Sequence, residues 1–578
     1  MNKSLVLIFA AVAAAACTAR YDVVVAGGGT GGTAAAIEAA RNGARVLVVE
    51  ESPWLGGMLT SAGVSAIDGN YRLRGGIFGE FTDSLAARYG GYEALRSGWV
   101  SNILFNPAAG AEIFRNMAEE AGVQLRFGTS VTEIRPGWRL TLSDGTRIKA
   151  RILIDGTELG DVAKAAGAEA LDDGVTLQDL TYVAVVKEYD HPVPVPEPEG
   201  YSTDTYRSCC RNPLAEDCGG VNPLGQQLWS ADMMLSYGRL PDGHIMLNWP
   251  VAGNDIYLDY LDMPRDSVYR LAKNRTLGYI RFLQTGLGME NLGIADDVFP
   301  SEDGLPFYPY YREARRIAGR DTMTVSAARD PYATDLYTRA VAVGDYPVDH
   351  HHVQNPRREE LSHLWFGKIP SFSVPLGVVI PVKVEDLLVA DKAVSASWEM
   401  NGAVRLQPVI TGLGQAAGAL AALAVLFVRA SCSRAKVIPR RTLVKIYADM
   451  FLVDEWVKDN PSLRRTVDTS LIYEPVFEHY GYTTDDYIKS VGHYMNDTER
   501  YARMLKKAGD ILQKKGATLR REEEVNFIKI INGIVKIMFE FVTLIAFLNN
   551  LNINFFFNLL RQFSFAPSHQ IRKRFQSC

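Results

Sequence analysis

The sequence predicts an α/β fold organised around a parallel sheet, on three observations. Residues 21–50 read YDVVVAGGGTGGTAAAIEAARNGARVLVVE: an apolar run, a glycine-rich turn, a helix of small residues and a second apolar run that ends in an acid. Further short apolar runs occur at 150–155 and 386–390. Such runs are typical of strands buried on both faces of a sheet. We therefore predict a Rossmann-like domain with two dinucleotide-binding segments, an inserted, mostly β domain and a C-terminal helical extension.

The glycine-rich turn has the spacing that a dinucleotide-binding turn requires. Gly27, Gly29 and Gly32 stand in G-x-G-x-x-G register. The first permits a tight turn, the second lets the backbone approach a pyrophosphate, and the third allows close helix–strand packing. An acid at the end of the second strand favours an unphosphorylated ribose. An ordinary βαβ unit with a glycine-rich turn is the alternative. The contacts predicted from this unit are Gly27, Gly29, Thr30, Gly32, Glu50 and Glu51.

Three further segments favour flavin over nicotinamide. Residues 51–58, with paired glycines, resemble the strand-to-loop continuation of flavoproteins that bind FAD through two dinucleotide domains. Residues 150–161 resemble the second signature of these flavoproteins, in which a strand end brings backbone near the cofactor. Residues 411–418 open a small-residue helix whose N-terminus can stabilise the charge of reduced flavin. The contacts predicted here are Gly57, Met58, Val131, Asp155, Gly156, Asp391, Arg405, Gly412, Gly414, Gln415 and Ala416.

Residues 21–430 together resemble a family of bacterial FAD-dependent oxidoreductases, some members of which are labelled xanthan lyases. The motifs that carry the resemblance are YYREARRI at 310–317, NWP at 248–250 followed by GND at 253–255, and DYPVD at 345–349. The resemblance implies a non-covalently bound FAD and a glutathione-reductase-like superfold. It leaves the substrate unassigned. We expect the flavin domain at 21–165 and 370–430, with a substrate domain at 166–369 between its two parts.

The predicted catalytic residues lie in the insertion. A histidine beside a carboxylate can titrate near neutrality and accept an alcohol proton. The run His350 to His352, close to Tyr346 and Asp349, has this composition. A solvated loop or an adventitious metal site is the alternative for the histidines, and an ion-pair network is the alternative for the arginine. The residues predicted for catalysis are His350, His351, Tyr346 and Arg312.

Composition excludes one class of partner and constrains the cysteines. A net charge of −5 and a pI of about 6.1 leave no electrostatic footprint for nucleic acid. No histidine pair stands at metal-ligand spacing near the cysteines, so no metal is predicted. Cys209, Cys210 and Cys218 lie in a Pro/Gly-rich stretch. We expect one structural disulfide among these cysteines; a redox-active dithiol is the alternative.

Both ends of the chain carry apolar segments. Residues 1–16 have the form of a secretory signal, and the box before Cys17 resembles a lipoprotein cleavage site, which predicts export and a lipid anchor at the periplasmic face or outer membrane. An ordinary signal peptide is the alternative. Residues 439–515 are predicted to form a helical module. The apolar, Asn-rich segment 527–560 fits a membrane helix, a packed helix or a non-native reading frame after about residue 521.

We expect, in total, an exported FAD-dependent oxidoreductase that passes hydride from a small polar substrate, such as a carbohydrate-derived alcohol, to flavin. Quinone, a periplasmic protein or oxygen are open as the electron acceptor. Two alternatives remain: an FAD-containing enzyme that eliminates or isomerises a polysaccharide fragment without net redox change, and a glycan-binding accessory protein with a vestigial flavin site. The substrate and the oligomeric state are left open.

Overall fold

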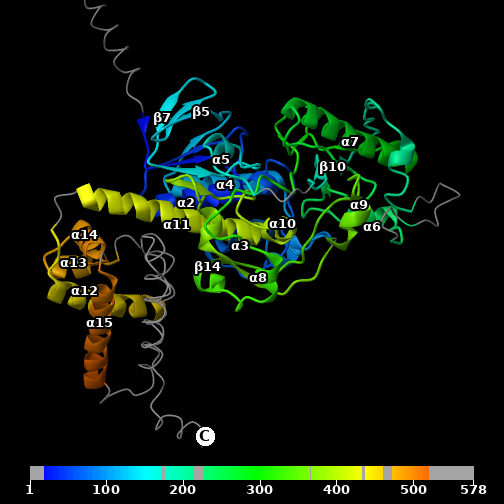
Figure 1. Ribbon diagram of the computed structural model, residues 1–578. Helices are drawn as coiled ribbons and strands as arrows, with labels where there is room; N and C mark the ends of the chain where they lie inside the picture. Colours follow the sequence, from blue (N-terminus) through cyan, green and yellow to red (C-terminus); the bar gives the residue numbers. More distant parts are fainter. Residues whose placement is uncertain are drawn as a thin grey trace, which may run out of the picture. The chain divides into compact units, whose positions relative to one another are not determined.

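The computed structural model describes residues 19–171, 176–211, 221, 226–364, 366–432, 436–459, 472–495 and 497–519. The chain forms two compact units, residues 1–425 and 426–578 (Figure 1). Each unit is described by itself. Cys17, Cys218 and the apolar segment 527–560 lie outside the described residues.

A five-stranded parallel sheet forms the centre of the first unit. Its strand order is β16-β8-β2-β3-β4. The bounds are β2 (Val23–Ala26), β3 (Val46–Val49), β4 (Gln124–Arg126), β8 (Ile152–Asp155) and β16 (Leu387–Val389). Ala26 pairs with Val49 on one side and with Asp155 on the other, and Asp155 pairs with Val389. The carboxyl ends of four strands therefore meet at one edge, where open α/β sheets bind ligands.

Two helices from distant parts of the sequence pack against each other beside this sheet. They are α2 (Thr30–Arg41) and α11 (Gln407–Cys432), which run alongside each other in Figure 1. A β-carbon on Gly414 would lie 2.1 Å from the carbonyl oxygen of Gly31, and one on Gly418 would lie 2.2 Å from that of Ala35. The glycines allow this close approach. The contact confirms that the two flavin segments fold together.

Among the described residues, α11 is the one helix long and apolar enough to cross a membrane, over Gln407–Phe427. Within its most apolar stretch, 61% of the residues are buried inside the protein, as expected of a core helix. Further helices of the first unit are α3 (Gly76–Tyr89), α4 (Pro107–Glu120), α5 (Asp161–Ala165) and α10 (Trp398–Val404). A four-stranded sheet completes the region, in the order β1 (Ala19–Arg20), β7 (Arg147–Lys149), β6 (Arg139–Leu142) and β5 (Val131–Arg135).

The inserted region combines small antiparallel sheets with one long helix. In it, β10 (Ala184–Glu188) lies between β11 (Ile245–Leu247) and β13 (Leu292–Ile294), and β9 (Leu180–Thr181) pairs with β12 (Asp255–Ile256). Helix α7 (Arg265–Gly286) contributes Tyr279, Ile280 and Leu283 to the buried core of this region. The remaining elements are α6 (Ala231–Ser236), α8 (Val325–Arg329), α9 (Arg358–Leu361) and the pair β14 (Ala340–Gly344) and β15 (Phe372–Pro375).

Short 3₁₀ turns connect the elements of the first unit. The 3₁₀ turns are η1 (Gly57–Leu59), η2 (Tyr92–Leu95), η3 (Thr203–Thr205), η4 (Leu336–Arg339), η5 (Ser362–Leu364) and η6 (Leu376–Val379).

The described part of the second unit is helical and contains α12 (Arg440–Asp459), α13 (Glu474–His479), α14 (Thr484–Met495) and α15 (Thr498–Leu519). Tyr447 and Tyr501 share a hydrogen bond of 2.6 Å in its core.

Candidate functional site

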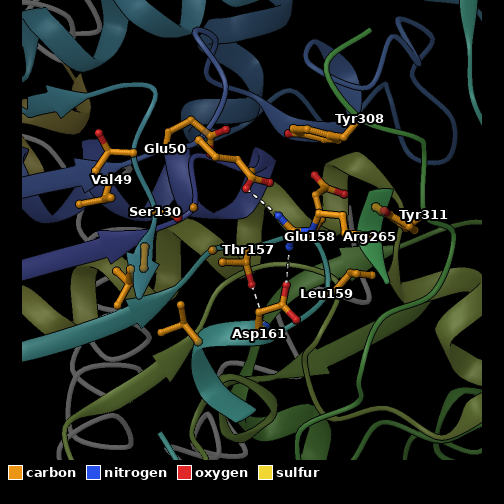
Figure 2. Close-up of a pocket in the computed structure, with 18 of the residues that line it drawn as sticks. Val49, Glu50, Ser130, Thr157, Glu158, Leu159, Asp161, Arg265, Tyr308 and Tyr311 are labelled. Carbon is orange, nitrogen blue, oxygen red and sulfur yellow. Dashed lines mark hydrogen bonds and ion pairs between the residues drawn. The ribbon is translucent and has the colours of Figure 1, made fainter. Parts of the chain in front are cut away.

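A cavity of about 260 Å³ opens at the carboxyl edge of the parallel sheet. Figure 2 shows its walls, with Glu50 following β3, Ser130 preceding β5, and Thr157 and Glu158 following β8. Six of the residues predicted to contact the cofactor line it: Gly27, Gly29, Glu50, Glu51, Val131 and Gly156. Residues from the turns after four strands thus meet in one place, as the sequence predicts.

The glycines of the first turn are required by close backbone contacts. Gly27 has φ +94°, and a β-carbon on it would lie 2.5 Å from the backbone of Gly156 and Thr157. A β-carbon on Gly29 would lie 2.6 Å from the Asp391 carboxylate. The turn is therefore a narrow cradle at the N-terminus of α2, where the helix dipole favours a phosphate.

Glu50 closes the turn from the side of β3. Its carboxylate accepts hydrogen bonds from the backbone N–H groups of Gly28 at 2.6 Å and Ser52 at 2.8 Å. Burial raises the pKa of Glu50 to about 7, and the hydrogen bonds from Ser52 and Gly28 oppose this shift. Because the carboxyl group also lines the cavity, it can accept hydrogen bonds from ribose hydroxyls there.

A buried lysine and two acids stand beside the turn. Asp391 accepts a hydrogen bond of 2.9 Å from the N–H of Gly31, and the ammonium of Lys392 pairs with Glu158. Burial raises the pKa of Asp391, and the charge of Lys392 opposes the shift. Oε1 of Glu158 is buried without a hydrogen-bond partner among the described residues. It would lie 2.4 Å from a β-carbon on Gly57, so this corner holds a polar atom that lacks a protein partner.

Arg265 crosses the mouth of the first cavity. This residue begins α7, in the inserted region. Its guanidinium bonds the carboxylate of Glu51 at 2.7 Å and that of Asp161 at 3.1 Å (Figure 2). Tyr308 and Tyr311 line the same wall. The insertion thus supplies part of a site whose floor comes from the parallel sheet.

The structure contains a second cavity, with a volume of about 610 Å³. Gly57 abuts Gly29 and Glu158 of the first cavity, and the next residue, Met58, lines the second. Arg405, Leu406 and Gln407 line it from the end of α10 to the start of α11, and the remaining walls come mostly from the insertion. The two cavities therefore lie on either side of the turn at Gly57 and Met58.

One end of the second cavity is a buried network of charges. The guanidinium of Arg312 bonds Asp255 at 3.1 Å, and that of Arg405 bonds Asp349 at 3.3 Å. His351 lies between the two acids, with Nδ1 at 3.3 Å from Asp255 and Nε2 at 3.2 Å from Asp349. Arg312, Arg405, Asp349 and His351 line the cavity.

Both acids that flank His351 have lowered pKa values. Burial disfavours the charge of Asp349, but His351, Arg405 and Arg312 together lower its pKa to about 2. Burial likewise disfavours the charge of Asp255, yet its pKa is lowered by Arg312 and His351. Because each ring nitrogen of His351 already lies within 3.3 Å of one of these carboxylates, neither nitrogen is open to a substrate hydroxyl.

The structure separates the residues predicted for catalysis. Tyr346, His351 and Arg312 line the second cavity, whereas His350 does not. His350 packs against Trp398, its Nδ1 lies 3.2 Å from Nε2 of His352, and its Nε2 lies 3.0 Å from the carbonyl oxygen of Glu399. Burial, followed by the neighbouring His352, lowers the pKa of His350 to about 3. His350 is therefore a neutral core residue.

Several residues predicted to contact the cofactor line neither cavity. Asp155 accepts hydrogen bonds from the N–H groups of Thr157 and Ala163 and so holds the turn after β8. Gln415 bonds the N–H of Ile77 and the carboxylate of Glu38. The others support the turn or the packing of α2 and α11, or stand beside them: Thr30, Gly32, Gly57, Asp391, Gly412, Gly414 and Ala416.

Sequence reasoning missed the aromatic wall of the second cavity. Trp99 stacks on Trp229 with ring centroids 4.9 Å apart, and Tyr237 meets Trp99 edge-on at 4.9 Å. The exposed fractions of Trp99 and Trp229 are 40% and 45%. Asp68 was missed as well, and it lines the same cavity. Tryptophans in an otherwise unpatterned stretch were the one signal available in the sequence.

Two cysteines reach this cavity region. Cys209 and Cys210 are free and buried, with their sulfur atoms 3.6 Å apart, and Cys209 lines the second cavity. Their pairing with Cys218 stays a prediction, because Cys218 lies outside the described residues. Over the described ranges, no group of three or more His, Cys, Asp or Glu side chains is arranged to hold a metal ion.

These features fit FAD. The narrow glycine cradle suits the pyrophosphate of an adenine dinucleotide, and the Glu50 carboxylate and the unpartnered Glu158 oxygen can accept hydrogen bonds from its hydroxyl groups. When bound, FAD supplies a two-electron acceptor.

One comparison with known proteins supports this fit. The family described as FAD dependent oxidoreductase matches residues 22–438, and a domain of unknown function, DUF4296, matches residues 435–518. Among curated proteins, none matches the chain.

The solved structures that resemble part of the chain are distant. OxyS anhydrotetracycline hydroxylase from Streptomyces rimosus is 20% identical with a TM-score of 0.22, over 30% of this chain and 38% of its own. NikD, an unusual amino acid oxidase essential for nikkomycin biosynthesis, is 19% identical with a TM-score of 0.20, over 31% and 61%. L-proline dehydrogenase from P. horikoshii is 16% identical with a TM-score of 0.22, over 31% and 62%. These values carry no argument about function. The family match spans most of the chain and agrees with the cofactor expected from its turns: the chain belongs to the FAD dependent oxidoreductase family.

Proposed function

We propose that this FAD-dependent oxidoreductase takes hydride from a small polar, hydroxylated substrate, such as a carbohydrate-derived alcohol, seated in the second cavity. The observation that carries the proposal is the composition of this cavity, about 610 Å³ in volume, with an aromatic wall at one side and fixed charges at the other. A pocket of this size, with few convergent polar groups, is typical of small-molecule sites.

The aromatic wall supports a ring-shaped, partly apolar substrate. Trp99 is fixed in place because its Nε1–H donates a hydrogen bond of 2.6 Å to the carbonyl oxygen of Met233. Trp229 stacks on it and remains exposed. Aromatic faces bind rings at low entropic cost because few torsions are lost. The C–H face of a sugar can therefore pack on Trp229.

The charged end supports a substrate that bears oxygen substituents. The guanidinium groups of Arg312 and Arg405 and the imidazole of His351 stand against the two carboxylates of Asp255 and Asp349. Nε of Arg405 and Oδ1 of Asp349 are buried and have no protein partner among the described residues. Buried polar groups require partners, and hydroxyl groups of a substrate can supply them. These groups orient the substrate without taking its proton.

We assign the first cavity to the adenosine half of FAD, with Glu50 at the ribose and Gly27 to Gly29 at the pyrophosphate. Met58 and Arg405 then face the isoalloxazine region. We further propose that the protein is exported with a lipid on Cys17, on the strength of residues 1–17 alone. Outside the cytoplasm, electrons must leave to an acceptor other than cytosolic NAD⁺.

The test uses the chain without residues 1–16, purified and loaded with FAD. We expect a yellow protein whose flavin absorption bleaches anaerobically with at least one compound from a panel of sugars and sugar alcohols, and does not bleach with its deoxy analogue. Bleaching by none of the panel would refute the proposal. Formation of an unsaturated product without bleaching would favour elimination, and a colourless protein that takes up no FAD would favour the glycan-binding alternative.

A further inference from the structure

We propose that Asp68 is the group of the second cavity that accepts the hydroxyl proton of the bound substrate. This inference rests on the proposed function, because it names the base for the same oxidation. Asp68 was not among the residues expected from the sequence, and it belongs to neither the histidine run nor the charge network.

The position of Asp68 meets the geometric requirement for a base. It follows the bridge between Ala66 and Leu104, and it lines the second cavity together with Met58 and Arg405. It is partly buried. Its backbone N–H donates to Gln407 at 3.4 Å. Among the described residues, none donates a hydrogen bond to its carboxylate, which is therefore free to bind a substrate hydroxyl.

The surroundings of Asp68 adjust its proton affinity. Burial raises its pKa to about 7, the carboxylate of Asp349 adds to this shift, and the charge of Arg405 opposes it. The phenols of Tyr237 and Tyr346 face the same space and are neutral, since burial raises the pKa of each well above its ordinary value. A base is most effective when its pKa is near the working pH.

The other titratable groups of the cavity are less suitable. Asp349 has a pKa of about 2 and is therefore a weak base. Both ring nitrogens of His351 already lie within 3.3 Å of the carboxylates of Asp255 and Asp349. Asp345 is exposed, and its carboxylate accepts a hydrogen bond of 2.9 Å from Ser371. By elimination, Asp68 is the carboxylate here that combines an open oxygen with a near-neutral pKa.

The step balances as follows. The substrate C–H bond breaks with its electron pair leaving to the FAD that the family provides, so the substrate loses two electrons and FAD gains them. The substrate O–H bond breaks at the same carbon, and its proton passes to Oδ of Asp68. A C=O bond forms. The products are a carbonyl compound, reduced flavin and a neutral Asp68, which returns its proton to water.

The test compares Asp68→Asn with Asp83→Asn, which removes an exposed carboxylate on α3 outside both cavities. We expect Asp68→Asn to bind FAD and to melt as the wild type does, but to slow anaerobic flavin bleaching by about 10²–10⁴-fold, the usual contribution of a general base. Asp68→Glu should recover part of the rate. The wild-type rate should rise with pH through about 7, because the ionised carboxylate is the active form, and Asp68→Asn should lose this rise.

A second measurement requires no substrate. The infrared difference spectrum of the FAD-loaded wild type between about pH 6 and pH 8 should contain protonated-carboxyl absorption from Asp68 and from Glu50, whose pKa is also about 7, so Asp68→Asn should lose part of this absorption and Glu50→Gln a different part. Unchanged bleaching in Asp68→Asn, or absorption as strong as in the wild type, overturns the assignment of Asp68. If no compound bleaches the wild type, the proposed function fails, and weaker absorption in Asp68→Asn still shows that Asp68 exchanges a proton in this pH range.

Discussion

The carbonyl oxygen of Gly31 lies 2.1 Å from the position that a β-carbon on Gly414 would occupy. Gly31 belongs to the first turn of α2 and Gly414 to α11, so residues far apart in the sequence meet where the cofactor turn begins. We expect Gly414→Ala to force these helices apart and to lower the free energy of unfolding by about 1–3 kcal/mol, the usual cost of overpacking. Thermal or urea unfolding measures it.

Gly75→Ala is the matched control for this substitution. Gly75 has φ −108°, which any residue adopts, and no atom lies within 4 Å of its would-be β-carbon. The free energy of unfolding of Gly75→Ala should equal that of the wild type or be slightly higher. Equal effects of the two substitutions would contradict the close packing of α2 and α11. We also expect Gly414→Ala to bind FAD more weakly.

Glu50 makes stability depend on pH. Burial raises its folded-state pKa from 4.5 to about 7. The unfolded chain releases this proton near pH 4.5, whereas the folded protein keeps it until about pH 7. The stabilisation is therefore complete below the unfolded pKa and is lost as pH rises, by about 3 kcal/mol in total.

We expect the melting temperature of the FAD-free wild type to fall more between about pH 5 and pH 7.5 than that of Glu50→Gln. Scanning calorimetry at both pH values measures the difference. The exposed carboxylate of Glu119 gives the control, because Glu119→Gln should keep the wild-type decline. Parallel declines in the wild type and Glu50→Gln would mean that Glu50 is ionised throughout.

Arg265 should slow the release of FAD. It bonds Glu51 and Asp161 across the first cavity. Because the guanidinium is about half exposed, the two ion pairs together contribute about 1 kcal/mol. Arg265→Ala should therefore release FAD about fivefold faster, as measured by the rise of free-FAD fluorescence. Arg270→Ala, which removes an exposed arginine of the same helix, should match the wild type. An unchanged rate in Arg265→Ala would show that Arg265 does not retain the cofactor.

Trp229 should affect substrate affinity more than turnover. It is exposed at the wall of the second cavity and stacks on Trp99. Loss of one aromatic face costs about 1 kcal/mol, so Trp229→Ala should raise KM about fivefold with little change in kcat. Tyr332→Ala removes an aromatic ring that is 79% exposed and lines neither cavity, and it should leave both constants unchanged. A fall in kcat alone would argue against the proposed aromatic platform.

The parts of the site that sequence could predict are those with local signatures. Gly27, Gly29 and Glu50 follow strand ends at fixed spacing, and the parallel sheet brings such residues together whatever the rest of the chain does. The inserted region has no comparable pattern. There, neighbouring residues of an extended segment point in opposite directions, so the histidine run could not reveal that His351 faces the cavity while His350 packs against Trp398.

Asp68 illustrates a second limit. Its carboxylate lies in a loop without periodicity, and its chemistry depends on Asp349 and Arg405, which follow it by hundreds of positions. Long-range packing sets the pKa of such a group. Gln415 shows the converse case: its motif resembles a flavin contact, yet the side chain bonds Glu38 and the backbone of Ile77. Motifs locate a backbone more reliably than they orient a side chain.

Arg265 ties two tasks of the protein to one helix. Arg265, which lines the first cavity, begins α7, and buried residues of the same helix belong to the core of the inserted region. Replacing the inserted region to alter substrate preference would therefore also change the affinity for the coenzyme. Enzyme engineers who exchange this region between relatives should screen first for retained yellow colour and only then for new activity.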